Sequence, residues 1–306
     1  MNKNTYVSHD GVKLNLYAST IQNPKAVVYI AHGMAEHAGR YEHFAKLLNE
    51  SGYDVYADDH RAHGESMIEG YRLGSCEGDV FADTVEDIQS ITRYLKGKYS
   101  LPVFVIGHSY GSFLTQAFME CPNVADGYIL IGSARMPKIL TSSGRIVAVL
   151  TKLFKGEHAP AKMLANINFG GYDKKFREGK NAWLSVDMHN RDAYNQDPMC
   201  GQVMSAGFYE SFFRGISTLY LKKNLANVSK HKPILILSGT MDAVGGFKKY
   251  VASLYDTYVS IGANVSLKLV EGARHEVLNE TDTLKQEANE SILNFLSMCL
   301  GSDDED

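Results

Sequence analysis

The most constraining feature of the sequence is a five-residue turn between an apolar run and a helical segment. Val103–Ile106 reads VFVI, Gly107–Gly111 reads GHSYG, and the segment SFLTQAFMEC follows directly. A strand that turns this sharply into a helix needs small residues on both sides of the central serine, because the serine is held in a strained backbone conformation. The pattern therefore predicts that Ser109 stands at the carboxyl end of a parallel strand, with its hydroxyl above the sheet.

Short β-rich runs alternate with helical segments over most of the chain, which predicts a mostly parallel sheet covered by helices on both faces. The opening segment, residues 5–19, alternates about Asp10-Gly11 and is typical of a hairpin. The expected strands of the sheet are Ala26–Ala31, Asp54–Asp58, Val103–Ile106, Gly127–Ile131, Pro233–Leu237 and Val265–Val270. The expected helices are Arg40–Ser51, about Asp79–Tyr99, the segment after the serine turn, and Leu284–Cys299. The acidic end, Ser302–Asp306, is expected to be disordered.

One stretch of about 100 residues, between the fourth and fifth of these strands, interrupts the alternation. Loops of this length are rarely structureless within a compact domain. We therefore predict an inserted helical cap (lid) over residues 135–227, with residues 1–134 and 228–306 forming the core.

The first half of this cap is basic. Residues 135–180 hold ten Lys or Arg and three Asp or Glu, a formal charge of +7. Ile146–Phe154 is apolar, while Arg145, Ala148, Lys152 and Lys155 fall on one stripe at helical spacing. This pattern predicts an amphipathic helix with a cationic face. Such a helix either packs its apolar face over a pocket, with the lysines in solvent, or makes transient contact with a membrane surface.

A serine hydroxyl is a poor nucleophile and needs a base, together with a third group that orients the base. In folds built around this serine turn, the chain order is serine, acid, histidine. Asp242 follows the expected strand PILILSG and His275 follows VSLKLVEG, so both should lie at the sheet edge that carries Ser109. Of the eleven histidines, only His275 both follows the acid and lies after a strand. Glu271, four residues before the histidine, is the alternative acid.

The composition excludes several classes of protein. The chain is 44% hydrophobic and 22% charged with a net charge of −4, and so lacks the basic surplus of a nucleic-acid binder. No apolar run approaches the roughly 18 residues of a membrane span, and the opening MNKNTYVS lacks the apolar core of a signal peptide. The four cysteines follow no metal or redox spacing. We therefore expect a cytoplasmic protein with no metal and no cofactor, and no pattern predicts an oligomeric state.

Three segments resemble a known family. The run HGMAEHAGRY, residues 32–41, resembles the H-G-x-x-E-H-x-x-R-Y signature of the monoacylglycerol lipase and lysophospholipase group, which is often classed with serine aminopeptidases. Residues 58–66, DDHRAHGES, are similar to that group's D-H-x-G-H-G-x-S segment, and residues 193–198, AYNQDP, look like the end of its cap. The resemblance runs from Val7 to Phe295 and is weakest in the cap.

This resemblance implies an α/β-hydrolase fold and a serine hydrolase that acts on small acyl esters such as monoacylglycerols or lysophospholipids. It implies that Ser109 is the nucleophile, His275 the base and Asp242 the orienting acid. The main-chain N–H groups of Met34 and Tyr110 are the expected oxyanion donors.

The sequence departs from that group at three places. Tyr110 stands where Met is usual, Ser112 where Gly is frequent, and Arg61-Ala62 where a small spacer and Gly are usual. We expect Asp59 and His60 to hold loops near the site.

Three other functions remain open. A short-chain carboxylesterase would use the same residues, and a hydrolase-fold binding protein would lack turnover. An aminopeptidase would need a cluster of carboxylates in the cap to hold the substrate ammonium, and the basic surplus there argues against it.

Overall fold

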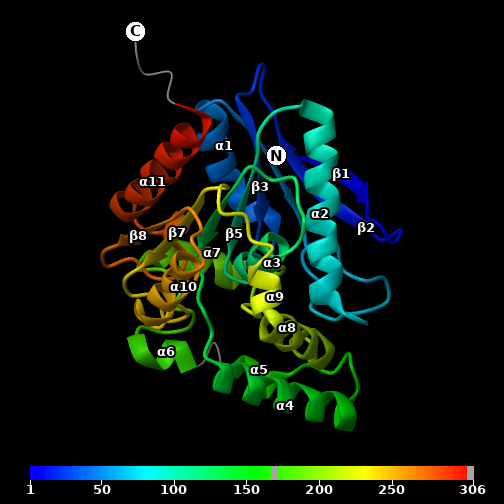
Figure 1. The fold of residues 1–306 in the computed structure, drawn as a ribbon. Coiled ribbons are helices and arrows are strands. Elements are labelled where there is room, and N and C mark those ends of the chain that lie inside the picture. The colour runs from blue at the N-terminus through cyan, green and yellow to red at the C-terminus, as the bar shows by residue number, and fades with distance from the viewer. Residues whose placement is uncertain (167–170, 302–306) are drawn as a thin grey trace.

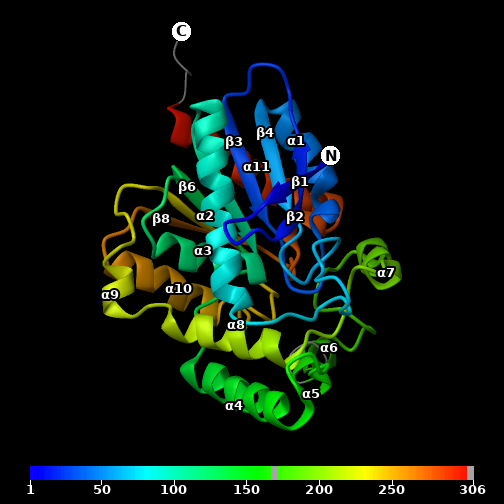
Figure 2. The same ribbon diagram turned by 90° about the vertical axis from the view of Figure 1, so that its right-hand side faces the viewer.

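The computed structural model describes residues 1–166 and 171–301, and the acidic end Ser302–Asp306 lies outside the described residues. One sheet of eight strands has the order β1-β2-β4-β3-β5-β6-β7-β8, with helices on both faces (Figures 1 and 2). The strands are β1 Asn2–Val7, β2 Lys13–Ser19, β3 Ala26–Ala31, β4 Tyr53–Asp58, β5 Val103–His108, β6 Gly127–Ile131, β7 Ile234–Gly239 and β8 Val265–Val270. The α/β-hydrolase fold predicted from the sequence is confirmed, and every predicted strand lies within two residues of an observed one.

The sheet is parallel from β4 through β3, β5, β6 and β7 to β8, while β2 is antiparallel to both β1 and β4. The helices of the alternating part are η1 Ala38–Tyr41, α1 Glu42–Glu50, α2 Val80–Tyr99, α3 Tyr110–Met119, α10 Lys249–Ser260, η3 Val277–Asn279 and α11 Asp282–Leu300. The predicted helix Arg40–Ser51 is therefore a 3-10 turn followed by a shorter α-helix.

Each face of the sheet has its own apolar core. The side chains of β3 alternate: Val27 and Tyr29 point to one face, and Val28 and Ile30 to the other. The first face packs against α2, α3 and α10, and the second against α1 and α11. Because both faces are covered, the central strands are apolar throughout, which explains why their sequences read as continuous hydrophobic runs.

The segment between β6 and β7 is helical in the described residues. Its helices are α4 Lys138–Lys155, α5 Lys162–Ala165, α6 Gly171–Phe176, α7 Met188–Gln196, α8 Ala206–Thr218 and α9 Lys222–Leu225. α4, α5 and α8 form a layer below the sheet in both ribbon views (Figures 1 and 2). No helix of the described chain is both long and apolar enough to cross a membrane. The boundaries 135–227 of the cap stay a prediction.

The orientation of α4 differs from the expected packing over a pocket. The face of α4 toward α8 carries small side chains, Thr141 and Ala148, and Gly144 lies against the ring of Phe213. The large apolar residues point outward instead: Ile139 is 77% exposed and Phe154 82%. Ala148, which belongs to the predicted cationic stripe, thus lies in the packed face.

Two cations of this stripe are paired with cap carboxylates. Arg145 lies 3.8 Å from Glu210, and Lys152 lies 2.7 Å from Glu157. The helix is amphipathic as predicted, but solvent meets its apolar face. Small residues allow α4 to approach α8 closely, and the hydrophobic pattern alone does not reveal this.

Candidate active site

Ser109 occupies the predicted turn between β5 and α3. Its backbone has φ 52° and ψ −115°, a left-handed conformation that is strained for a residue with a side chain. Neither flanking glycine could carry a Cβ: at Gly107 it would lie 2.3 Å from the Thr115 hydroxyl, and at Gly111 it would lie 2.0 Å from the Ala31 carbonyl oxygen. The turn is therefore held by close backbone packing, which places the Ser109 side chain at the carboxyl end of the sheet.

The structure brings Asp242 and His275 to this serine. His275 Nε2 lies 2.8 Å from Ser109 Oγ, and His275 Nδ1 lies 3.0 Å from Asp242 Oδ1. Because Asp242 accepts the Nδ1 proton, Nε2 is left as an acceptor for the serine hydroxyl. This is the arrangement of a nucleophile, a base and an orienting acid.

The Asp242 carboxyl group is kept ionised although it is fully buried. Burial tends to raise its pKa, but the electrostatic interaction with the His275 ring and several hydrogen bonds outweigh burial and hold the pKa of Asp242 below its ordinary value. One of these bonds is donated by Val244 N to Asp242 Oδ1 at 2.8 Å. The carboxylate therefore supplies a fixed negative charge to the imidazole.

The alternative acid, Glu271, does not reach the imidazole. It lies directly after β8 and its side chain is exposed, whereas Asp242 is buried against the His275 ring. The geometry thus favours Asp242 as the orienting residue.

The two predicted oxyanion donors line one cavity with Ser109. Tyr110 is the first residue of α3, so its N–H has no partner within the helix, and Met34 lies in the loop after β3. Neither N–H donates a hydrogen bond to another described residue. Both groups are available to a negatively charged oxygen formed next to Ser109.

The oxyanion loop is fixed by a buried ionic network that the sequence analysis did not predict. Glu36 accepts the Gly33 N–H at 2.6 Å and is paired with Arg40. Arg40 also makes two hydrogen bonds, of 2.7 and 2.8 Å, to the carboxylate of Glu276, the residue after the base. One guanidinium therefore connects the loop that carries Met34 to the loop that carries His275.

His108, which precedes the nucleophile, extends this network. Its Nδ1 lies 3.2 Å from Glu36 Oε1, and its Nε2 lies 3.4 Å from the main-chain oxygen of His275. Burial tends to lower the pKa of His108, but the hydrogen bond and charge of Glu36 outweigh burial and raise it. The His108 side chain thus connects the loop of Glu36 with the loop of His275. This contact agrees with the sequence-based prediction that His275, and not His108, is the base.

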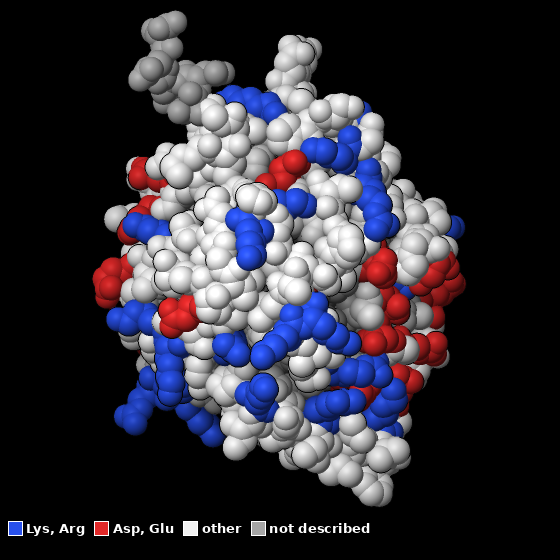
Figure 3. Space-filling view, viewed as in Figure 1, with Lys and Arg blue, Asp and Glu red and all other residues white. Residues whose placement is uncertain are grey.

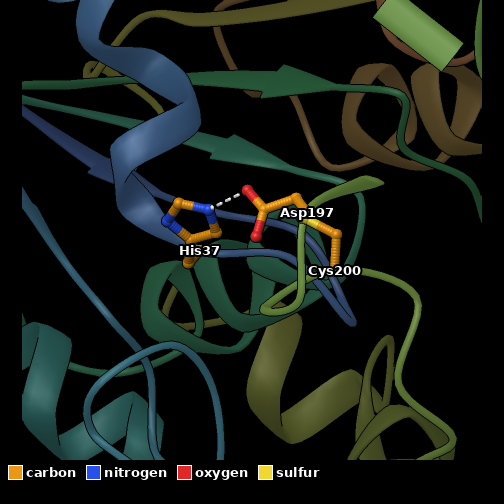
Figure 4. A group of neighbouring side chains, drawn as sticks. All are labelled: His37, Asp197 and Cys200. Carbon is orange, nitrogen blue, oxygen red and sulfur yellow. Dashed lines mark hydrogen bonds and ion pairs between the residues drawn. The ribbon is translucent and has the colours of Figure 1, made fainter. Parts of the chain in front are cut away.

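The end of the cap braces the oxyanion loop from the other side. Tyr194 OH and Gly201 N both donate to the Ala35 carbonyl oxygen, at 3.0 and 2.8 Å. His37 Nε2 lies 2.8 Å from Asp197 Oδ2 (Figure 4). The HGMAEHAGRY and AYNQDP segments, 160 residues apart at this contact, thus meet in space.

Three side chains beside this contact are close enough to bind a metal ion together. A nitrogen of His37, an oxygen of Asp197 and the sulfur of Cys200 lie within 4.8 Å of one another (Figure 4). The bonding argues for a different role. His37 Nδ1 accepts the Gly39 N–H, so Nε2 carries the ring proton that it donates to Asp197. Burial raises the pKa of the Cys200 thiol, which disfavours the thiolate that metals bind. We interpret the group as a brace.

The three departures from the family pattern have structural counterparts. Arg61 donates to Asp87 of α2 and to Asp10 of the hairpin turn, with its closest contacts at 2.6 Å. Ala62 has φ 68°, so it holds a left-handed conformation where Gly is usual. Ser112 donates to Ser133 at 2.8 Å.

Tyr110, the remaining departure from the family pattern, contacts α8, whereas Asp59 and His60 hold loops. The Tyr110 ring packs against cap residue Phe208, at 5.2 Å between centroids. Asp59 accepts the Ala38 and Glu65 N–H groups, both at 2.9 Å, and so holds loops as predicted. His60 does the same through its N–H, which donates to His32 Nε2 at 2.9 Å.

Two cavities of opposite character meet at Ser109. One, of about 70 Å³, is mainly apolar and is lined by Met34, Ser109, Tyr110, Phe113, Met136, Tyr172, Trp183, Phe212, Phe213 and Val244. The other, of about 20 Å³, is more polar, and the residues that distinguish it are Glu36, His108, His275 and Glu276. A bound molecule would therefore place an apolar group and a polar group on different sides of the nucleophile.

The family model described as serine aminopeptidase S33 matches residues 22–282. The chain is 29% identical to the monoglyceride lipase of Homo sapiens over 263 residues, which cover 84% of this chain and 77% of that protein. It is 27% identical to the monoglyceride lipase homolog of Monkeypox virus over 283 residues, 90% of this chain and 91% of that protein. Among solved structures it is similar to a carboxyl esterase from Bacillus coagulans in complex with glycerol, with a TM-score of 0.88, 25% identity and 98% of each chain covered.

The geometry predicts that a fluorophosphonate, which reacts with activated serine hydroxyls, labels Ser109. Asp242→Asn should slow labelling by roughly 10³ to 10⁴, because the imidazole then loses its favoured tautomer. Glu271→Gln, the matched control, should label at the wild-type rate. Mass spectrometry of the labelled peptide and its time course would measure both effects. The reverse ranking of the two variants would assign the orienting role to Glu271.

Proposed function

The chain belongs to the serine aminopeptidase S33 family, and we propose that it is a carboxylic ester hydrolase that acts on monoacylglycerol-like esters through an acyl-enzyme at Ser109. The observation that carries the proposal is the 2.8 Å contact between His275 Nε2 and Ser109 Oγ, with Asp242 behind the imidazole. The similarity to the human monoglyceride lipase and to its Monkeypox virus homolog supports the class of substrate.

In the proposed mechanism, His275 Nε2 takes the proton of Ser109 as Oγ attacks the ester carbonyl carbon. The N–H groups of Met34 and Tyr110 hold the resulting oxyanion. His275 then returns the proton to the departing alcohol. Water, deprotonated by the same imidazole, attacks the acyl-enzyme and releases the acid. No cofactor takes part in any step.

The two cavities at Ser109 support one orientation of the ester. The acyl chain enters the apolar cavity between Phe113 and Phe212, since buried methylene groups gain about 0.8 kcal/mol each. The alcohol lies on the side of the more polar cavity, which His108 and Glu276 line. A glycerol-like alcohol fits that chemistry better than a second alkyl group.

Aminopeptidase activity is less well supported. Glu36 and Glu276 are the carboxylates closest to the nucleophile in the polar cavity, and both are paired with Arg40. Neither is free to hold the ammonium of a peptide N-terminus.

The outward face of α4 supports a transient contact of the cap with a membrane surface. Ile139, Leu153 and Phe154 are each more than 70% exposed. Basic side chains gather over the lower part of the molecule, where the cap helices lie in Figure 1 (Figure 3). Exposed apolar side chains beside cations are the pattern of helices that lie in the interface of anionic lipid. We propose that α4 docks there; the cap boundaries 135–227 and the cytoplasmic location stay predictions.

The ester proposal predicts that kcat/KM rises from acetyl to medium-chain esters, by up to about fourfold for each methylene that the apolar cavity buries. Met136→Ser, in the cavity wall, should flatten this rise, whereas Met298→Ser, on the outer face of α11, should not. The measurement is steady-state kinetics on p-nitrophenyl esters, monoacylglycerols and aminoacyl amides. A preference for acetyl esters would make the protein a short-chain carboxylesterase, and a preference for the amides would make it an aminopeptidase.

The membrane proposal predicts that the protein sediments with vesicles that contain phosphatidylserine. The double variant Leu153→Ser with Phe154→Ser should weaken this binding by roughly tenfold or more. The variant lacks the two large apolar side chains whose transfer from water into the lipid stabilises the bound state. Met298→Ser removes an equally exposed methionine from α11 and is the control. If the double variant binds the vesicles as well as the wild type does, α4 is not the segment that contacts the membrane.

A further inference from the structure

A larger cavity, of about 760 Å³, adjoins the apolar cavity at the nucleophile. The two share Phe113 and Met136 in their linings, so these two side chains separate the cavities. The larger one lies between the start of α4, the end of α8 and the start of α10. Its volume falls in the range of ligand sites.

The larger cavity is lined by three cations, Arg135, Lys138 and Lys249, and by no Asp or Glu. No carboxylate of a described residue pairs with any of the three. This separates them from Arg145 and Lys152 farther along α4, which are paired with Glu210 and Glu157. Arg135 is held in place by its hydrogen bond to Thr257 Oγ1 at 2.7 Å and by the ring of Tyr220 below its guanidinium.

Other groups in the lining add to this positive potential. The first turns of α4 and α10 both border the cavity, and helix N-termini carry partial positive charge. The hydroxyls of Ser142 and Ser253 supply neutral hydrogen-bond donors. The lining is therefore complementary to a carboxylate, and it differs from the polar cavity on the other side of Ser109, which contains Glu36 and Glu276.

We propose that this cationic cavity binds a carboxylate at the far end of the substrate's acyl chain. The proposal rests on the proposed function, since the acyl chain must run from Ser109 past Phe113 and Met136 to reach the cations. It adds a specificity that the family resemblance does not imply: acyl groups that carry a negative charge at their free end are preferred over neutral ones of equal length.

The test compares p-nitrophenyl monoesters of dicarboxylic acids with the same esters carrying a terminal carboxamide, over chains of 4 to 12 carbons. We expect kcat/KM to favour the carboxylate by about tenfold at one chain length, with most of the difference in KM. Lys249→Gln and Lys138→Gln should each reduce this preference by up to about fivefold, the upper range for an exposed ion pair. Turnover of the carboxamide esters should not change.

Lys248→Gln is the matched control, because Lys248 is exposed beside Lys249 but does not line the cavity. Equal kcat/KM for carboxylate and carboxamide at every length, or an equal effect of Lys248→Gln, would overturn the proposal. A carboxylate preference of the same size at every chain length would also contradict the proposal. Diffuse electrostatic attraction would give that result, because it requires no fixed distance between the ester and the carboxylate.

A binding measurement keeps this inference separate from the ester proposal. The free dicarboxylate of the best length should bind Ser109→Ala saturably in calorimetry, and Lys249→Gln should weaken that binding. If no ester is turned over but this binding is present, the proposed function fails and the anion site stands. If carboxamide esters are turned over and no dicarboxylate binds, the anion site fails and the proposed function stands.

Discussion

The active-site geometry depends on one constraint, the strained turn at Ser109. A left-handed serine between β5 and α3 persists only because Gly107 and Gly111 let the first turn of α3 lie against the ends of β3 and β5. The turn directs the hydroxyl to the carboxyl edge of the sheet. Asp242 and His275 reach the same edge because β7 and β8 are parallel to β5. Packing at the two glycines thus offsets the strain at Ser109, and the parallel strands bring the other two residues to it.

Buried charge then fixes the loops around the nucleophile. Arg40 lies between two buried carboxylates, Glu36 and Glu276, which satisfy its guanidinium away from water. One carboxylate holds the loop of Met34, and the other follows the base directly in sequence. The cap adds the His37–Asp197 pair and the bonds to the Ala35 carbonyl from the opposite side. The proposed oxyanion donors, Met34 N–H and Tyr110 N–H, therefore lie on a loop and a turn that are held by contacts from both sides, an arrangement that suits preorganised catalysis.

The strands and the residues of the site were predictable because they depend on local patterns and chain order. Apolar runs located the buried strands, and the placement of Asp242 and His275 after two of them was sufficient to bring them to Ser109. Contacts between distant segments were not predictable: Arg40 and Glu276 are 236 residues apart, and nothing local pairs them. The orientation of α4 was also missed. Its apolar stripe was visible in the sequence, but the packed face consists of Thr141, Gly144 and Ala148, whose small size has no signal in a hydrophobic pattern. The cationic cavity likewise depends on a contact between distant segments, because the first turns of α4 and α10 line the same space.

The proposed mechanism requires that Ser109 carries the acyl group covalently during turnover. The most direct measurement is rapid-quench mass spectrometry of the wild-type protein mixed with p-nitrophenyl octanoate. We expect an octanoyl adduct on the peptide that contains Ser109, formed with the burst of p-nitrophenol and lost at the rate of turnover. Steady turnover without an adduct, or an adduct on any other residue that forms and decays at the catalytic rate, would contradict the account.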